Sequence, residues 1–181
     1  MEGLEVFIVC FSSVVGRNVT VIGKNVDFGV FCVVFRRGFD DFSLVSGFLV
    51  VLLHWGKELD ECPLPAQQEL ADALVAAGAD AVVGSHAHRQ LGQGWLSAGE
   101  RRAFVDYGLG NFVFYARGTG ATTQSGVLHL TLAGRGGVSA AQWRPAQIRS
   151  GLPVPLEGAA ADAAVQAKAA LRPCTDLSET P

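Results

Sequence analysis

The amino-acid sequence predicts an α/β fold, and three observations lead to this prediction. A continuous apolar run, Phe48–Leu53, is followed by a helix-forming segment and then by a second apolar run, Ala81–Val83. Each run ends in a loop that carries histidine: His54 after the first, and His86 and His88 after the second. Further along the chain, glycine-containing turns separate short apolar segments, which is typical of β-hairpins.

The composition indicates one packed globular domain. The chain has 181 residues, 49% of them hydrophobic and 17% charged, so it can bury a sizeable core and is not expected to be disordered. The net charge of −3 gives no reason to expect nucleic acid or an anionic membrane as a partner. We interpret the apolar stretches Leu4–Val15 and Leu44–Leu53 as buried strands, and detect no transmembrane segment. Glu2 and Glu5 stand where a signal peptide would carry positive charge, so the compartment is left open.

The cysteines form no CxxC pair and lie far apart in the sequence. We therefore expect neither a zinc site built from cysteine sulfur nor a disulfide framework. The four cysteines are Cys10, Cys32, Cys62 and Cys174.

Residues 1–46 form an atypical segment. Residues 1–50 contain no alanine, whereas residues 51–181 contain 24, a rate at which 50 residues would hold about nine. Segments Val19–Ile22 and Val30–Phe35 are predicted to be short buried strands. The segment is either a β-rich subdomain or a stretch of different origin, such as a fusion, a shifted reading frame or a misplaced start. We favour a different origin.

The middle of the chain, residues 47–150, has an orderly pattern that begins with a βαβ unit. Pro65 opens the helix at its first turn, Leu70, Leu74 and Val75 lie on one face, and Gly78 ends it. A strand–helix–strand unit of this length implies a parallel strand pair. Both histidine loops then leave the same edge of the sheet, where ligands bind in open α/β sheets.

Two hairpins and a tail follow. Gly94–Ser97 pairs with Ala103–Tyr107 in the first hairpin, and Val127–Leu132 pairs with Val138–Trp143 in the second, across a glycine-rich turn. Residues 151–181 are an alanine-rich, partly flexible tail, whose last ten residues we expect to be frayed.

The three loop histidines form a candidate metal site. Imidazole is a common ligand of zinc, manganese and iron. Two histidines spaced i, i+2 can face one ion if the loop turns between them, and we assign the room for that turn to Gly84. His54 from the neighbouring strand would complete one side of the site. An HxH pair alone is a weak signal, because single histidines are more often structural.

Three further segments give a more specific signal. The chain reads LLHWGKEL at residues 52–59, ALVAAGADAVVGSHAHRQLG at 73–92 and FVDYGLGNFVF at 104–114. In order and spacing these resemble the successive motifs HWGxE, AGAD, GxHPH and SLGNFVF of the CapA family of poly-γ-glutamate (capsule) biosynthesis proteins. The resemblance covers about residues 48–148. Ala87 replaces the usual proline and Gly108 the usual serine, and neither change removes a ligand.

The resemblance implies a calcineurin-like metallophosphoesterase-type sheet, present as its C-terminal half with added β-hairpins. It implies that His54, His86 and His88 bind a divalent metal such as Mn, Fe or Zn, and that the partners are the capsule synthesis machinery, often associated with the cell envelope. The family's GD, NLE and NNHxxD motifs, which supply the other ligands, are not found here. Asn25–Gly29 faintly echoes the third motif but lacks its histidine. The expected site is therefore weak or incomplete.

Four residues are assigned to the second shell of the site or to a cleft beside it. They are Trp55, Glu58, Gln90 and Asn111. Glu58 can assist a metal-bound water or be a solvated loop carboxylate, and Trp55 is either a cleft wall or a core anchor. Asp106 is a weak further candidate, and His129 is expected to face solvent or a neighbouring strand.

The function expected from the sequence is a CapA-like role in poly-γ-glutamate or capsular polymer biosynthesis, carried by a truncated metallophosphoesterase-like domain. Two alternatives remain open. One is an active metal-dependent phosphoesterase, which requires bridging carboxylates that the sequence does not supply. The other is a non-catalytic remnant or binding module.

Overall fold

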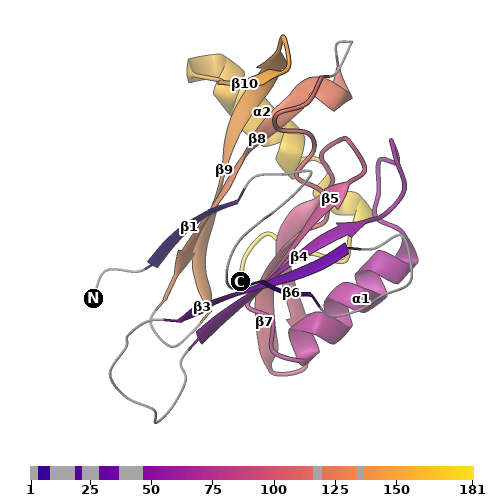
Figure 1. Cartoon of the computed structure of the whole chain (residues 1–181), viewed down its shortest axis with the longest axis vertical. Coiled ribbons are helices and arrows are strands. Elements are labelled where there is room, and N and C mark those ends of the chain that lie inside the picture. Colours follow the sequence, from indigo (N-terminus) through magenta and orange to yellow (C-terminus); the bar gives the residue numbers. More distant parts are fainter. Residues whose placement is uncertain (1–3, 9–18, 22–28, 37–46, 116–119, 134–136) are drawn as a thin grey trace.

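The structure, a computed structural model, describes residues 4–8, 19–21, 29–36, 47–115, 120–133 and 137–181 (Figure 1). The strands are β1 (Leu4–Ile8), β2 (Val19–Val21), β3 (Gly29–Arg36), β4 (Gly47–Trp55), β5 (Ala81–His86), β6 (Gln93–Ala98), β7 (Arg101–Asp106), β8 (Gln124–Leu132), β9 (Val138–Arg149) and β10 (Leu152–Pro155). The helices are α1 (Pro65–Ala76), α2 (Gly158–Ala169) and two short 3-10 turns, η1 (Ala121–Thr123) and η2 (Arg172–Cys174). The faint motif echo at residues 25–28 lies outside the described residues.

A six-stranded mixed sheet in the order β2-β3-β4-β5-β7-β6 contains the predicted βαβ unit. Strand β4 pairs with β5 in parallel, and β5 pairs with β7 in parallel, so three strands end at one edge. The parallel pair confirms the prediction from the strand–helix–strand pattern. Strand β3 pairs antiparallel with β4, and β2 pairs antiparallel with β3, so the predicted strands in the alanine-free segment are also present.

A second sheet of four antiparallel strands has the order β1-β8-β9-β10. Strands β8 and β9 form the second predicted hairpin, and β6 and β7 form the first. Strand β1, which falls within the apolar stretch expected to be a strand, pairs with β8 at the edge of this sheet. The described strands of the first 46 residues therefore contribute to both sheets.

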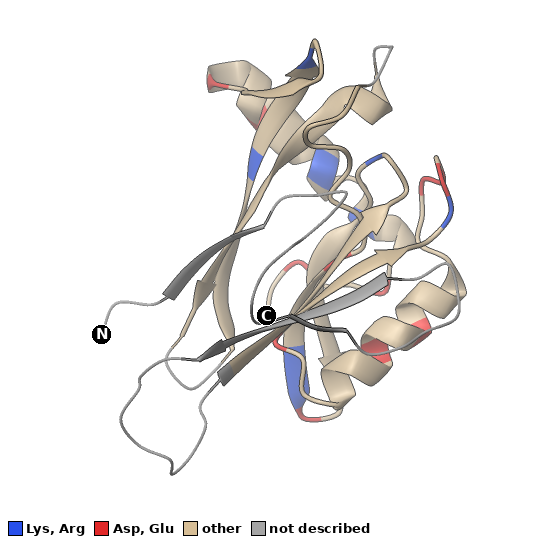
Figure 2. Ribbon diagram, viewed as in Figure 1, with Lys and Arg blue, Asp and Glu red and all other residues tan. Residues whose placement is uncertain are grey.

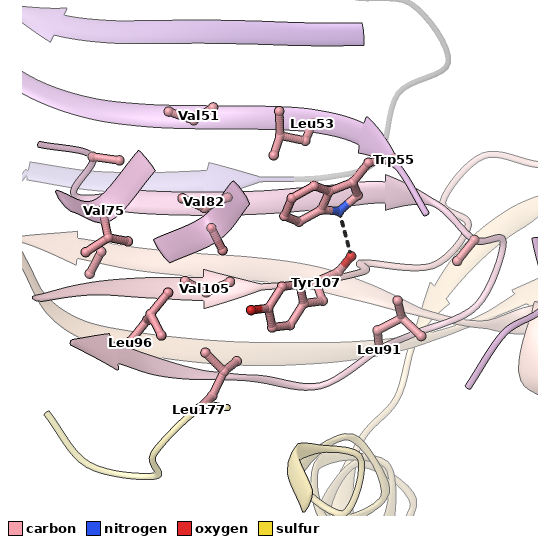
Figure 3. Packing of buried hydrophobic residues seen from close by; sticks show 14 residues of the cluster. Val51, Leu53, Trp55, Val75, Val82, Leu91, Leu96, Val105, Tyr107 and Leu177 are labelled. Carbon is pink, nitrogen blue, oxygen red and sulfur yellow. Dashed lines mark hydrogen bonds between the residues drawn. The ribbon is translucent and has the colours of Figure 1, made fainter. Parts of the chain in front are cut away.

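The strands alternate their side chains between two buried layers, which explains their continuous apolar runs. On one face, Val50 and Val83 pack against Leu130 and Trp143 of the four-stranded sheet. On the other face, α1 covers a second core, which includes the Trp55 ring shown with its neighbours in Figure 3. Figure 1 accordingly shows α1 and the four-stranded sheet on opposite sides of the six-stranded sheet.

Helix α1 begins at Pro65 as predicted, but its buried face differs from the prediction. The buried residues are Gln67, Ala71 and Val75, whereas Leu70 is 38% exposed. Gln67 is buried because its Oε1 accepts a hydrogen bond from the backbone N–H of Leu64 at 2.9 Å, which satisfies one amide at the helix start. The prediction for Leu70 was wrong because the buried stripe of α1 runs through Gln67, Ala71 and Val75.

The C-terminal tail packs against the body of the protein, which corrects the expectation that its last ten residues are frayed. Ser178 and Trp95 exchange backbone hydrogen bonds of 2.8 and 2.9 Å, and Leu177 is buried in the core beneath α1. A disulfide joins Cys62 to Cys174, across 112 positions of sequence. The expectation of no disulfide was wrong because the pairing depends on this tertiary contact. No helix among the described residues is long and apolar enough to span a membrane.

Candidate metal centre

The carboxyl ends of β4 and β5 bring the three loop histidines together. In the parallel register, Trp55 lies opposite His86 and His54 opposite Ser85. The ring centroids of His54 and His86 are 4.5 Å apart, and those of His86 and His88 are 6.1 Å apart. The predicted placement on one sheet edge is confirmed, while the role of these residues as metal ligands stays a prediction.

The turn between the two histidines of the HxH pair is made by the histidines themselves. His86 has φ 104° and His88 has φ 56°, both in the region that L-residues rarely adopt. Strained backbone of this kind is concentrated at functional sites. Gly84 lies inside β5, and a Cβ there would collide with the Trp55 indole and the Tyr107 carbonyl. Our assignment of the turn to Gly84 was therefore wrong: this glycine permits close packing below the site.

Glu58 joins the histidines as a potential ligand. One ligand atom each from Glu58, His86 and His88 lie within 4.8 Å of one another. The Nε2 atom of His88 is 3.8 Å from Oε1 of Glu58. The neighbouring Leu59, at φ 64°, donates its backbone N–H to the carbonyl of Ala87 at 2.9 Å, which ties this loop to the HxH turn. The loop after β4 carries charges of both signs (Figure 2).

Asn111 fixes the orientation and tautomer of His88. Its Nδ2 donates to the carbonyls of His88, at 3.2 Å, and of Thr122, at 2.9 Å. These two acceptors orient the amide so that its Oδ1 faces His88 Nδ1, at 2.8 Å. Because Oδ1 can only accept, Nδ1 must carry the proton, which leaves the Nε2 lone pair free toward Glu58 and His86. This is the second-shell arrangement by which proteins orient a histidine ligand.

His54 lies at the open side of the cluster and is exposed. Partial burial lowers the pKa of its imidazole, and the nearby His86 and His88 lower this pKa further. The hydroxyl of Ser85 donates to the Leu53 carbonyl at 3.3 Å and lies 3.4 Å from His54 Nδ1. A neutral imidazole is the form that binds metal.

The other residues singled out from the sequence are held in structural contacts. Trp55 is 1% exposed and donates Nε1–H to the Tyr107 carbonyl at 3.1 Å (Figure 3), so it anchors the core and does not line a cleft. Gln90 is buried and its backbone bridges to Leu109. Asp106 is fully buried in an ion pair away from the histidines, and His129 on β8 lies 2.9 Å from Arg144 of β9.

An apolar rim beside the histidines was not anticipated from the sequence. Val113, Phe114 and Tyr115 follow Asn111 and are 61%, 41% and 74% exposed. The ring of Phe114 lies 4.9 Å from that of His88. These residues lie in the irregular segment after β7, and their apolar sequence has no periodicity that would separate it from a buried strand, so pattern alone gave no signal.

Comparison with known proteins finds a family match over the candidate site. Residues 43–116 match the family described as bacterial capsule synthesis protein PGA_cap. The match covers 74 of the 181 residues of the chain. It contains all the residues of the histidine cluster together with Glu58 and Asn111.

Two curated CapA proteins are similar to the chain. The Capsule biosynthesis protein CapA of Bacillus anthracis is 37% identical over 114 residues, which cover 63% of this chain and 26% of that protein. The PGA biosynthesis protein CapA of Bacillus subtilis (strain 168) is 33% identical over 116 residues, which cover 62% of this chain and 28% of that protein. The chain thus spans about a quarter of the length of these relatives.

The donor set of this segment fits a divalent metal. Two imidazoles and one carboxylate, with the His54 imidazole beside them, suit Zn, Mn or Fe better than Ca or Mg, which prefer oxygen ligands. The ligand atoms of Glu58, His86 and His88 already converge without any bound group, and His54 is in ring contact with His86. These atoms offer ligands for one ion at the sheet edge.

Proposed function

We propose that this chain takes part in the synthesis of poly-γ-glutamate or a related capsular polymer, through one divalent metal held at the edge of its six-stranded sheet. The observation that carries the proposal is the convergence of Glu58, His86 and His88 within 4.8 Å, inside the segment that matches the PGA_cap family. The names of the two CapA relatives supply the class of polymer.

The proposal includes a calcineurin-like metallophosphoesterase fold in partial form. Two sheets packed face to face, a helix on the outer face and histidines at the carboxyl ends of parallel strands all support it. Residues 47–150 would be the unit that carries the family's role, with the capsule synthesis machinery as partner. The Cys62–Cys174 disulfide supports a location of the protein in an oxidising compartment.

In the proposed site, His54, His86, His88 and Glu58 would hold the metal, which we expect to be Mn, Fe or Zn. A bound ion of this kind supplies Lewis-acid polarisation of a phosphoryl or carbonyl oxygen. Asn111 keeps the proton of His88 on Nδ1, so that Nε2 stays available. The exposed rings of Phe114 and Tyr115 provide an apolar surface next to the ligand edge.

We propose metal binding without phosphoester hydrolysis by this chain alone. A two-metal phosphoesterase needs bridging carboxylates, and the cluster found among the described residues contains one carboxylate, that of Glu58. The sequence also lacks the family's GD and NNHxxD motifs. Of the two alternative functions, this favours the non-catalytic binding module or remnant over the active phosphoesterase.

Calorimetric titration of the purified chain with Zn²⁺ and Mn²⁺ tests the proposal. We expect one equivalent to bind, and His86→Ala or His88→Ala to weaken binding by at least about 10- to 100-fold, because each change removes a ligand. The matched control is His129→Gln, which alters a histidine on β8, outside the cluster. Equal metal affinity of the wild type and His86→Ala would refute the proposed metal site.

Hydrolysis of an aryl phosphate distinguishes the two candidates. With Mn²⁺ or Zn²⁺ added, the wild-type rate should equal that of His86→Ala, since no second set of carboxylates completes the site. A metal-dependent rate that His86→Ala abolishes would establish the active phosphoesterase instead.

A further inference from the structure

Helix α2 carries a fully buried lysine. Lys168 is the one buried residue of this alanine-rich helix, with 0% of its side chain exposed, and its carboxylate partner Asp106 on β7 is also 0% exposed. A buried ion pair costs desolvation that its own attraction often fails to recover. Burial raises the pKa of Asp106 and lowers the pKa of Lys168, while the attraction between the two groups opposes both shifts. If the only role of this residue were to pack α2 against the sheet, an apolar side chain would be sufficient.

The Lys168 ammonium uses all three of its protons. Its Nζ donates to the carbonyl of Leu91 at 2.9 Å, to the carbonyl of Gly108 at 3.0 Å and to Oδ1 of Asp106 at 3.0 Å. Oδ2 of Asp106, at 2.9 Å, lies within ion-pair distance but outside hydrogen-bond geometry. The ammonium also sits 4.8 Å from the centre of the Trp143 ring. Few other groups could satisfy two carbonyls and a carboxylate at one point.

The two carbonyls belong to the two segments that meet at the candidate metal centre. Leu91 lies three residues after His88, and Gly108 lies three residues before Asn111. The same segments are joined by the hydrogen bond from Leu91 N–H to Gly108 O, at 2.9 Å, and by the His88–Asn111 contact. Asp106 Oδ1 also accepts from Gly108 N–H at 2.9 Å, so the ion pair binds both the N–H and the carbonyl of Gly108.

We propose that Lys168 is a positioning residue for the candidate metal centre: it crosslinks the HxH segment to the Asn111 segment and thereby holds the His88–Asn111 hydrogen bond. The inference rests on the proposed function only in taking His88 as a metal ligand. It assigns a role to a helix outside the matched residues 43–116. The buried charge is then explained by the two carbonyls that it bridges, because an apolar side chain would remove the Lys168 donor from both and would no longer link them.

Two variants separate positioning from general stability. Lys168→Met leaves Asp106 buried without its partner and should unfold at lower denaturant concentration. Lys168→Met/Asp106→Asn removes both charges and keeps an oxygen that can accept from Gly108 N–H, so it should regain the part of the lost stability that comes from the unpaired Asp106 charge. Lys57→Met is the control, because Lys57 pairs with Asp60 on the surface.

The deciding measurement is the pair of imidazole ¹⁵N shifts of His88 in the protein without added metal. In the wild type we expect the Nδ1–H tautomer, and in the double variant a mixture of tautomers, together with about 10-fold weaker Zn²⁺ binding. Wild-type His88 shifts in a stable double variant would overturn the inference, because they would show that Lys168 only docks α2. If the wild type binds no Zn²⁺, the proposed function fails, and the His88 shifts still decide the role of Lys168.

Discussion

The side chain of Asn111 offers a test in which stability and metal binding should respond differently. It is 5% exposed and makes three hydrogen bonds, two through Nδ2 to backbone carbonyls and one through Oδ1 to His88. At about 1 kcal/mol for each net hydrogen bond, Asn111→Ala should lower the free energy of unfolding by about 3 kcal/mol. It should also weaken Zn²⁺ binding by about 10- to 100-fold, because His88 loses the acceptor that fixes its tautomer.

Asn111→Asp should separate the two effects. An aspartate keeps an oxygen opposite His88 Nδ1. Its other oxygen, however, faces the carbonyls of His88 and Thr122, to which the wild-type amide donates at 3.2 and 2.9 Å. We expect a loss of about 2 kcal/mol in the free energy of unfolding, with metal affinity equal to or above that of the wild type. Urea unfolding and calorimetric titration measure the two quantities. If Asn111→Asp loses metal affinity as far as Asn111→Ala does, the orientation argument is refuted.

Three further predictions follow from the packing and the sequence. Gly84→Ala should cost about 3 kcal/mol in urea unfolding, since the added methyl meets the Trp55 indole and the Tyr107 carbonyl, whereas Gly99→Ala, with open space around it, should cost only the strain of φ 63°, about 1 kcal/mol. Cys62→Ser should lower the free energy of unfolding by about 5 kcal/mol, the loop-closure value for a link of this length, and should abolish the effect of a reductant on thermal unfolding. If residues 1–46 come from a shifted reading frame, another frame of the coding DNA upstream of codon 48 should encode an alanine-rich segment with Gly-Asp and Asn-Asn-His motifs, and three frames without them would favour a fusion or a degenerate domain.

The sequence predicted the parts of the fold that follow from local pattern. The apolar runs and the intervening helix give the parallel pairing of β4 with β5, and that pairing places His54 beside His86. Asn111 was also assigned to the edge of the site, because its motif stands at the end of the next strand. Such inferences succeed because parallel strands present their carboxyl ends at one edge.

The rest depends on contacts that are distant in sequence. The membership of Glu58 in the cluster requires the left-handed turn at Leu59 and its bond to the HxH turn. Lys168 meets Asp106 across 62 positions, and an alanine-rich helix gives no sign of which polar residue turns inward. Gly84 was misread because a glycine between a strand and a loop suits a turn as well as a close packing contact.

The disulfide between Cys62 and Cys174 also determines how the protein responds to proteolysis. It closes a covalent ring that contains His86 and His88, and a single cut anywhere within that ring leaves both halves on one molecule until a reductant is added. His54 and Glu58 lie just outside the ring. The stretch from His54 to Cys62 is therefore where one cut can separate a proposed ligand from the others, and within it Leu59 is 56% exposed.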